Sequence, residues 1–104
     1  MDKQLYRLRY LPLFEQDLAD ARDYIAVTLQ NPVAANRLVE ETEKAIQERL
    51  SAPLSFKAYR SKKDRRHPYY RIYVKNFTVF YVVIDDTMEV RRFIYSRRDI
   101  DALI

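Results

Sequence analysis

Residues 69–95 read YYRIYVKNFTVFYVVIDDTMEVRRFIY, and this stretch decides the fold class. Aromatic and β-branched residues fill three segments, 69–74, 77–84 and 88–95, which are separated by two short polar connections. The connections carry Lys, Asn, Asp and Thr in a chain that has no glycine, and we expect positive φ angles there. The segment 77–84 is apolar on nearly both faces, which places it at the centre of a sheet. The stretch therefore predicts three consecutive strands.

Two amphipathic helices are predicted upstream of these strands. Residues 4–10 alternate as a strand does, and Pro12 suits the first turn of a helix. The apolar stripe of this first helix is Phe14, Leu18, Ala21, Ile25 and Leu29. Asn31 and Pro32 suit the N-cap and first position of a second helix, which Pro53 ends. Its stripe is Ala35, Leu38, Val39, Thr42, Ile46 and Leu50.

The predicted order is β-α-α-β-β-β, an α+β fold. Two helices joined by a short connection form an antiparallel hairpin, which we expect on one face of a mainly antiparallel four-stranded sheet. Residues 51–67 are predicted to be a long loop and 97–104 a helical turn. A chain of 104 residues fits a single domain, 1–104.

Composition excludes several classes of function. The chain has no cysteine, no glycine and one histidine, His67. Disulfides, thiolate metal sites and glycine-rich phosphate loops are therefore excluded, and we predict no metal and no cofactor. No stretch is apolar enough to cross a membrane, and the N-terminus lacks a signal-peptide pattern. We expect a cytoplasmic protein with no membrane partner.

Charge is distributed unevenly along the chain. Residues 11–54 carry eight acidic and four basic side chains, a net of −4, whereas residues 55–104 carry twelve basic and six acidic ones, a net of +6. The basic half is expected to meet a polyanion or an acidic partner. The alternative is that these charges only keep a loop and the protein surface solvated.

Five stretches of the chain carry a resemblance to a known superfamily. They are the pairs Asp17-Leu18 and Tyr24-Ile25, NPVAANRLVEETEKAIQERLSAP at 31–53, YRIYVKNFTVFYVVID at 70–85, and VRRFIYSRRD at 90–99. In this order they resemble the RelE/ParE superfamily of toxins from bacterial type II toxin–antitoxin systems, of the plasmid stabilisation type. The resemblance implies a growth-inhibiting toxin that a cognate antitoxin wraps and neutralises.

The resemblance implies two possible targets. ParE-like members inhibit DNA gyrase, whereas RelE-like members enter the translating ribosome and cut mRNA without a metal. For a RelE-like enzyme the catalytic candidates are Arg71, Tyr95 and Arg97, which would stabilise the phosphate and move protons. Thr78 departs from the RelE pattern, which has an arginine there, and this favours the ParE-like target. A third possibility is a non-toxic module that only binds an antitoxin.

Further basic residues are candidates for binding nucleic acid. They are Lys62, Lys63, Arg65, Arg66 and Arg98. For Tyr95, a buried structural role is the alternative. Arg91 and Arg92 are expected on opposite faces of the sheet, one of them pairing with a helix carboxylate such as Glu40 or Glu43.

Overall fold

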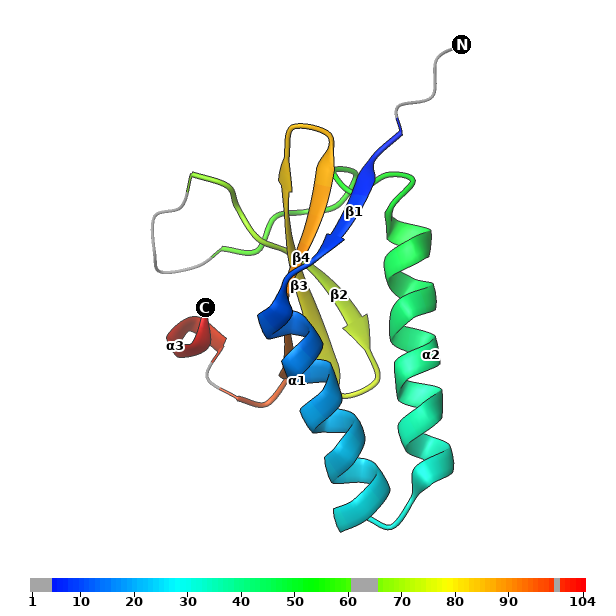
Figure 1. Cartoon of the computed structure of the whole chain (residues 1–104). Helices are drawn as coiled ribbons and strands as arrows, with labels where there is room; N and C mark the ends of the chain where they lie inside the picture. Colours follow the sequence, from blue (N-terminus) through cyan, green and yellow to red (C-terminus); the bar gives the residue numbers. More distant parts are fainter. Residues whose placement is uncertain (1–4, 61–65, 99) are drawn as a thin grey trace.

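Four strands form one sheet in the order β1-β4-β3-β2 (Figure 1). The computed structural model describes residues 5–60, 66–98 and 100–104. The strands are β1 (Arg7–Tyr10), β2 (Tyr70–Val74), β3 (Phe77–Ile84) and β4 (Thr87–Tyr95). β1 runs parallel to β4, and the other pairs are antiparallel. The prediction of an α+β fold with a mainly antiparallel four-stranded sheet is confirmed.

The helical hairpin follows the predicted signals closely in its second helix. α2 (Pro32–Arg49) begins after Asn31, whose side-chain oxygen accepts a hydrogen bond from the Ala34 N–H at 3.1 Å. Proline lacks a backbone N–H, but at the first helical position no hydrogen bond is lost, because an N–H there has no partner within the helix. The stripe is confirmed at its centre, since Ala35, Leu38, Thr42 and Ile46 are all buried.

The first helix departs from the prediction in its last turns. α1 (Pro12–Asp23) continues as a π-helix, η1 (Tyr24–Thr28), in which the Leu29 N–H donates to the Tyr24 carbonyl. The wider turn rotates the last part of the stripe out of register. Ile25 still packs against the core, but Leu29 is 55% exposed, so its predicted core position is wrong.

Both hairpin connections of the sheet use positive φ angles without glycine. Lys75 and Asp85 stand first in their two-residue turns and have φ of 52° and 55°. An L-residue in this region costs about 1 kcal/mol or more, and the strand pairs on either side hold it there. β3 spans the predicted residues 77–84, and β4 begins one residue earlier than predicted.

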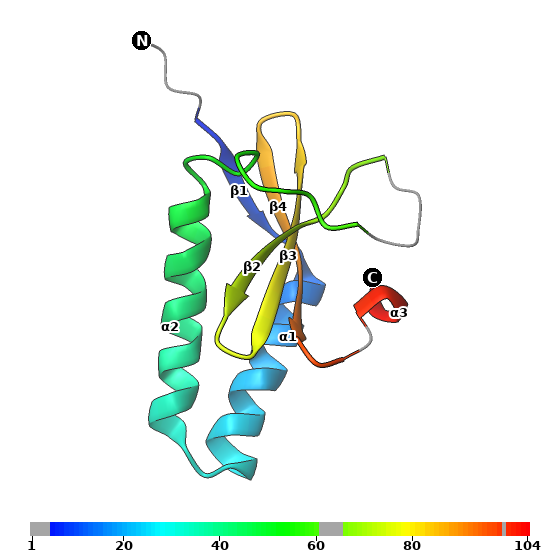
Figure 2. The ribbon, with the colours of Figure 1, turned by 180° about the vertical axis from the view of Figure 1, so that it is seen from behind.

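The sheet buries its two faces differently. α1 and α2 cover one face, where Phe14, Leu38 and Ile46 meet strand residues such as Val79 and Val90. The opposite face, called the second face below, carries a smaller cluster of Tyr69, Phe80, Val82 and Ile94. The segment after α2 crosses this face and contributes Tyr59, and α3 (Ile100–Leu103) contributes Ile100 and Leu103 (Figure 2). The predicted turn at 97–104 is thus a short helix that helps to close this cluster.

A β-bulge interrupts the pairing of β3 with β4. Phe80 pairs with Arg92, but the next residue, Tyr81, pairs with Val90, so Arg91 is the extra residue. A bulge shifts the alternation of side chains by one position. The prediction that Arg91 and Arg92 point to opposite faces fails for this reason.

Candidate functional site

The bulge directs both arginines to the second face. Arg91 bonds to Glu89 at 2.8 Å and to the Tyr69 side chain, and both of these partners lie on the second face. Burial lowers the pKa of Arg91, but the bonds to Tyr69 and Glu89 outweigh it and raise that pKa overall. Arg9 adds a longer contact to the same carboxylate, at 3.9 Å.

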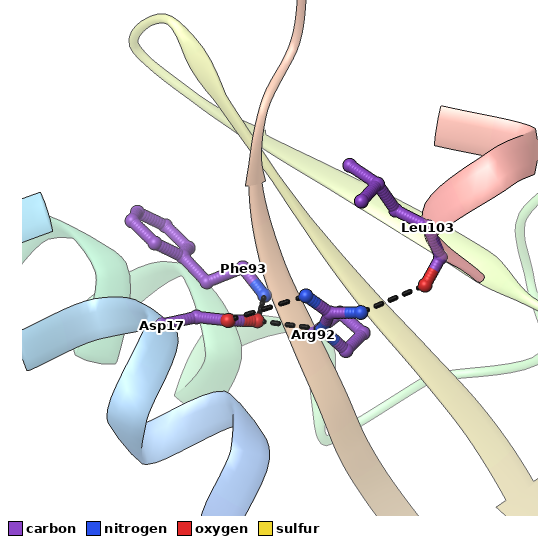
Figure 3. Close-up of polar contacts among 4 residues, drawn as sticks. All are labelled: Asp17, Arg92, Phe93 and Leu103. Atoms are coloured by element: carbon purple, nitrogen blue, oxygen red, sulfur yellow. Dashed lines mark hydrogen bonds and ion pairs between the residues drawn. The ribbon is translucent and has the colours of Figure 1, made fainter. Parts of the chain in front are cut away.

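Arg92 joins three elements at the edge of β4 (Figure 3). Its Nε donates to the Asp17 carboxylate of α1 at 2.7 Å, and its Nη1 donates to the Leu103 carbonyl of α3 at 2.8 Å. Asp17 also accepts the Phe93 backbone N–H at 3.0 Å. β1 stops pairing with β4 at Val90, so Asp17 bonds to an N–H of β4 beyond the end of β1.

One arginine of the pair bonds to a helix carboxylate as predicted, but the partner of Arg92 is Asp17 of α1. Glu40 and Glu43 make no ion pair with Arg91 or Arg92 in the described part of the chain; Asp17 and Glu89 do. The resemblance singled out the pair Asp17-Leu18, but a position on a helix says nothing about the strand edge below it, so the contact of Asp17 with β4 was not predicted.

Tyr95 lies at the end of β4 on the same side as the helices. Its ring meets Phe77 edge to face, with the ring centres 5.6 Å apart. The side chain is 38% exposed, so the alternative of a buried structural tyrosine is wrong. It borders a hollow of about 220 Å³ whose charged lining residues are Asp17, Asp20, Arg92 and Arg98. Both signs of charge are balanced in this hollow.

Arg71 lies on the opposite side of the sheet from Tyr95. It pairs in register with Phe80 on the second face, whereas Tyr95 pairs with Phe77 on the helical face. Arg97 is exposed in the turn after β4. The structure therefore does not bring the three catalytic candidates together on one face, and their nuclease role stays a prediction.

Thr78, the residue that departs from the RelE pattern, is buried. Its side chain is 1% exposed and its hydroxyl lies 2.8 Å from the Ser96 hydroxyl. Both hydroxyls gain a partner across the end of the β3–β4 pair. A charged side chain at this position would have to leave this buried site to reach a phosphate.

The predicted nucleic-acid-binding residues fall in different places. Lys62, Lys63 and Arg65 lie outside the described residues. Arg66 is exposed in the loop before β2, and Arg98 borders the hollow beside Tyr95. Arg66 does not line that hollow, and the binding role of both residues stays a prediction.

A polar junction that sequence reasoning missed ties the end of α2 to the sheet. The Arg49 Nη1 donates to the Arg71 carbonyl at 3.0 Å and to the Tyr81 hydroxyl at 2.9 Å. The Tyr81 hydroxyl in turn donates to the Pro53 carbonyl at 2.7 Å. Burial raises the pKa of Tyr81, and Arg49 opposes that change. The Arg49 guanidinium also stacks on Phe56, 3.4 Å from the ring centre.

A groove runs between α1 and α2 on the outside of the hairpin. Its floor contains Tyr10, Leu18 and Val39, and Glu15 and Glu43 line it as well. Burial raises the pKa of Tyr10, with smaller contributions in the same direction from Glu43 and Glu15. Arg22 also lines the groove, so the groove combines apolar side chains with two carboxylates and one guanidinium.

The described part of the chain contains neither a metal-ligand cluster nor a membrane-spanning helix. No group of three His, Asp or Glu side chains there is arranged to hold a metal ion. None of its helices has the length and apolar character needed to cross a bilayer.

Two comparisons with known proteins found a match, one to a family model and one to a solved structure. A family model described as "ParE toxin of type II toxin-antitoxin system, parDE" matches residues 8–100. A solved structure described as "Chromosomal ParDE TA system from P. aeruginosa" shares 14% sequence identity, with a TM-score of 0.74 over 88% of this chain and 97% of that one. At this identity the likeness shows the fold. No curated protein matches the chain.

Proposed function

The chain belongs to the ParE toxin family of type II toxin–antitoxin systems, and from this membership we propose that it arrests growth by inhibiting DNA gyrase in the cytoplasm. We also propose that a cognate antitoxin neutralises it. The match of the family model over residues 8–100 is the observation that carries the proposal. Membership in this family also confirms the superfamily resemblance seen in the sequence.

The placement of the nuclease candidates favours gyrase over mRNA cleavage. Metal-free cleavage of RNA needs a proton acceptor and cations around one phosphate. Arg71 and Tyr95 lie on opposite faces of the sheet, and Thr78 supplies no charge. Loss of one phosphate-stabilising group costs about a hundredfold in rate.

The groove between α1 and α2 supports an antitoxin partner. An apolar floor between two helices suits the apolar face of an amphipathic helix. Glu15 and Glu43 outnumber Arg22 on the groove, which would favour an antitoxin helix with Lys or Arg beside its apolar stripe.

Gyrase assays with the purified chain test the proposal directly. We expect the chain to block supercoiling of relaxed plasmid DNA by gyrase and to raise the amount of cleaved DNA. Addition of the antitoxin encoded beside the gene should restore supercoiling. In cells, expression of the toxin alone should give filaments and a DNA-damage response while transcripts stay intact.

Two other results would each replace this proposal. Normal gyrase activity together with mRNA cut at codons would establish the ribosome-dependent nuclease, and Tyr95→Phe or Arg71→Ala should then abolish the cuts. Normal growth at high expression of the folded chain would establish a non-toxic antitoxin-binding module.

A further inference from the structure

A cluster of cationic and aromatic side chains lies on the second face of the sheet, away from the α1–α2 groove. Lys57, Tyr59, Arg60 and Arg71 line an open hollow of about 280 Å³. Tyr73 flanks it from the same strand as Arg71. The hollow forms because the segment after α2 crosses the second face (Figure 2), where Tyr59 pairs with Tyr69, the residue before β2.

Arg71 is held by aromatic rings. Its guanidinium carbon lies 4.7 Å from the centre of the Tyr59 ring and 5.6 Å from that of Tyr73. Within residues 5–60, 66–98 and 100–104 it forms no ion pair. Ring contacts restrict the guanidinium without using its N–H groups, which match the oxygens of a phosphate.

Among the described residues that line the hollow, three are cations and none is a carboxylate. Lys57 and Arg60 are exposed and, in the described part of the chain, they too form no ion pair. Asp101 accepts the Tyr59 hydroxyl hydrogen bond at 2.8 Å but does not line the hollow. Three cations therefore converge on one open surface, which favours an anionic ligand.

The exposed aromatic ring beside these cations distinguishes between anions. Tyr73 is 65% exposed although it lies within a strand. An acidic polypeptide would use the cations alone, whereas a single-stranded nucleic acid uses cations for its phosphates and flat rings for its bases. We propose that this cluster binds the phosphate backbone of single-stranded nucleic acid, with Arg71 on a phosphate and Tyr73 against a neighbouring base. This binding involves no cleavage and does not depend on which target the toxin inhibits.

Fluorescence anisotropy with labelled oligonucleotides tests the proposal. The probes are single strands of DNA and RNA of the same sequence, about 12 nucleotides long, which is within the usual site size. The test variants are Arg71→Ala and the double variant Lys57→Ala with Arg60→Ala. The matched control is the double variant Arg37→Ala with Lys44→Ala, which removes the same charge from exposed positions of α2.

The salt dependence of binding measures how many cations contact phosphate. Each contact contributes about 0.7 to the slope of log K against log salt for a single strand. The Lys57/Arg60 variant should therefore lower the slope by about 1.4, while the Arg37/Lys44 control leaves it nearly unchanged. Arg71→Ala should weaken binding about tenfold, because a charged hydrogen bond is lost. Tyr73→Ala should weaken binding without changing the slope.

Three results would overturn the proposal. They are the absence of binding at low salt, an equal loss in the site and control variants, and tighter binding of an acidic peptide than of either oligonucleotide. A preference between the DNA and RNA probes would identify the source of the phosphates and would support the site. Gyrase inhibition is measured separately on the same variants, so failure of this site and failure of the proposed target are distinguishable.

Discussion

Removal of the Asp17 carboxylate tests the joint between α1, β4 and α3. The carboxylate accepts from Arg92 Nε at 2.7 Å, from Arg92 Nη2 at 3.3 Å and from the Phe93 N–H at 3.0 Å. Asp17→Ala leaves the guanidinium and the backbone N–H without this acceptor, although Arg92 keeps the Leu103 carbonyl. The two side chains are only 19% and 14% exposed, so water replaces the carboxylate poorly.

The expected loss follows from the burial of the pair. Breaking a buried ion pair by removing one partner costs about 3–5 kcal/mol. Because both side chains keep some exposure, we expect the lower end, about 3 kcal/mol, from Asp17→Ala. Asp17→Asn keeps an acceptor for the Phe93 N–H and should lose about half as much. In a domain of this size the alanine variant should lower Tm by about 12 °C or more.

Urea unfolding followed by far-UV circular dichroism measures these losses, since the chain has no tryptophan. The control is Asp20→Ala, one turn further along α1, where an exposed carboxylate accepts a hydrogen bond from Gln16 and from no other described side chain. Its loss should stay below about 0.5 kcal/mol. If Asp17→Ala destabilised the chain no more than Asp20→Ala does, the joint would contribute nothing to stability and the reasoning would fail. In a double-mutant cycle with Arg92→Met, the loss of unfolding free energy in the double variant should be smaller than the sum of the losses in the two single variants.

Three smaller predictions concern single side chains. Tyr81→Phe removes the hydrogen bonds that the hydroxyl makes with the Arg49 guanidinium and the Pro53 carbonyl, and it should cost about 2 kcal/mol or more in urea unfolding. Burial raises the pKa of Tyr81, so the folded state holds the phenol proton more tightly than the unfolded state does. The free energy of unfolding should therefore be constant up to about pH 10 and fall as the pH rises through the folded pKa. Unfolding of Tyr81→Phe, measured against pH, should lack that fall. Asn31→Ala removes the N-cap of α2 and should lower the free energy of unfolding in urea by about 1 kcal/mol. Asn31→Ser keeps a capping oxygen and should retain most of that stability. Thr78→Val keeps the buried volume and loses only the hydrogen bond to Ser96, so a loss well above about 1.5 kcal/mol would contradict the contact.

The helices and strands were predictable because their signals are local. Asn31 and Pro32 mark the start of α2, and the polar connections predicted at 75–76 and 85–87 mark the two hairpins, of which the second is one residue shorter in the structure. The π-helix was not predictable from the sequence. The same residues suit an α-helix and a π-helix, and the two differ only in which carbonyl accepts each backbone hydrogen bond. Leu29 was therefore assigned to the core and lies exposed.

The candidate site was less predictable, because a single bulge changes which face a side chain occupies. Strict alternation separates Arg91 from Arg92, and the extra residue opposite β3 puts both on the second face. Arg71 and Tyr95 were grouped by resemblance alone. Alternation along 69–74 puts Arg71 on the face opposite Ile72 and Val74, whereas the face of Tyr95 depends on the bulge in β4, which the residues did not indicate.

The charge of a segment is a poor guide to binding until its internal pairs are removed. Several cations of the basic half form ion pairs within the chain. Lys75 pairs with Glu41, Arg91 with Glu89 and Arg92 with Asp17. Among the described residues, the cations of that half that form no ion pair are Lys57, Arg60, Arg66, Arg71, Arg97 and Arg98. Lys57, Arg60 and Arg71 share one hollow beside an exposed ring. Convergence of unpaired cations, rather than the net charge of +6, is what makes the second face a candidate surface for nucleic acid.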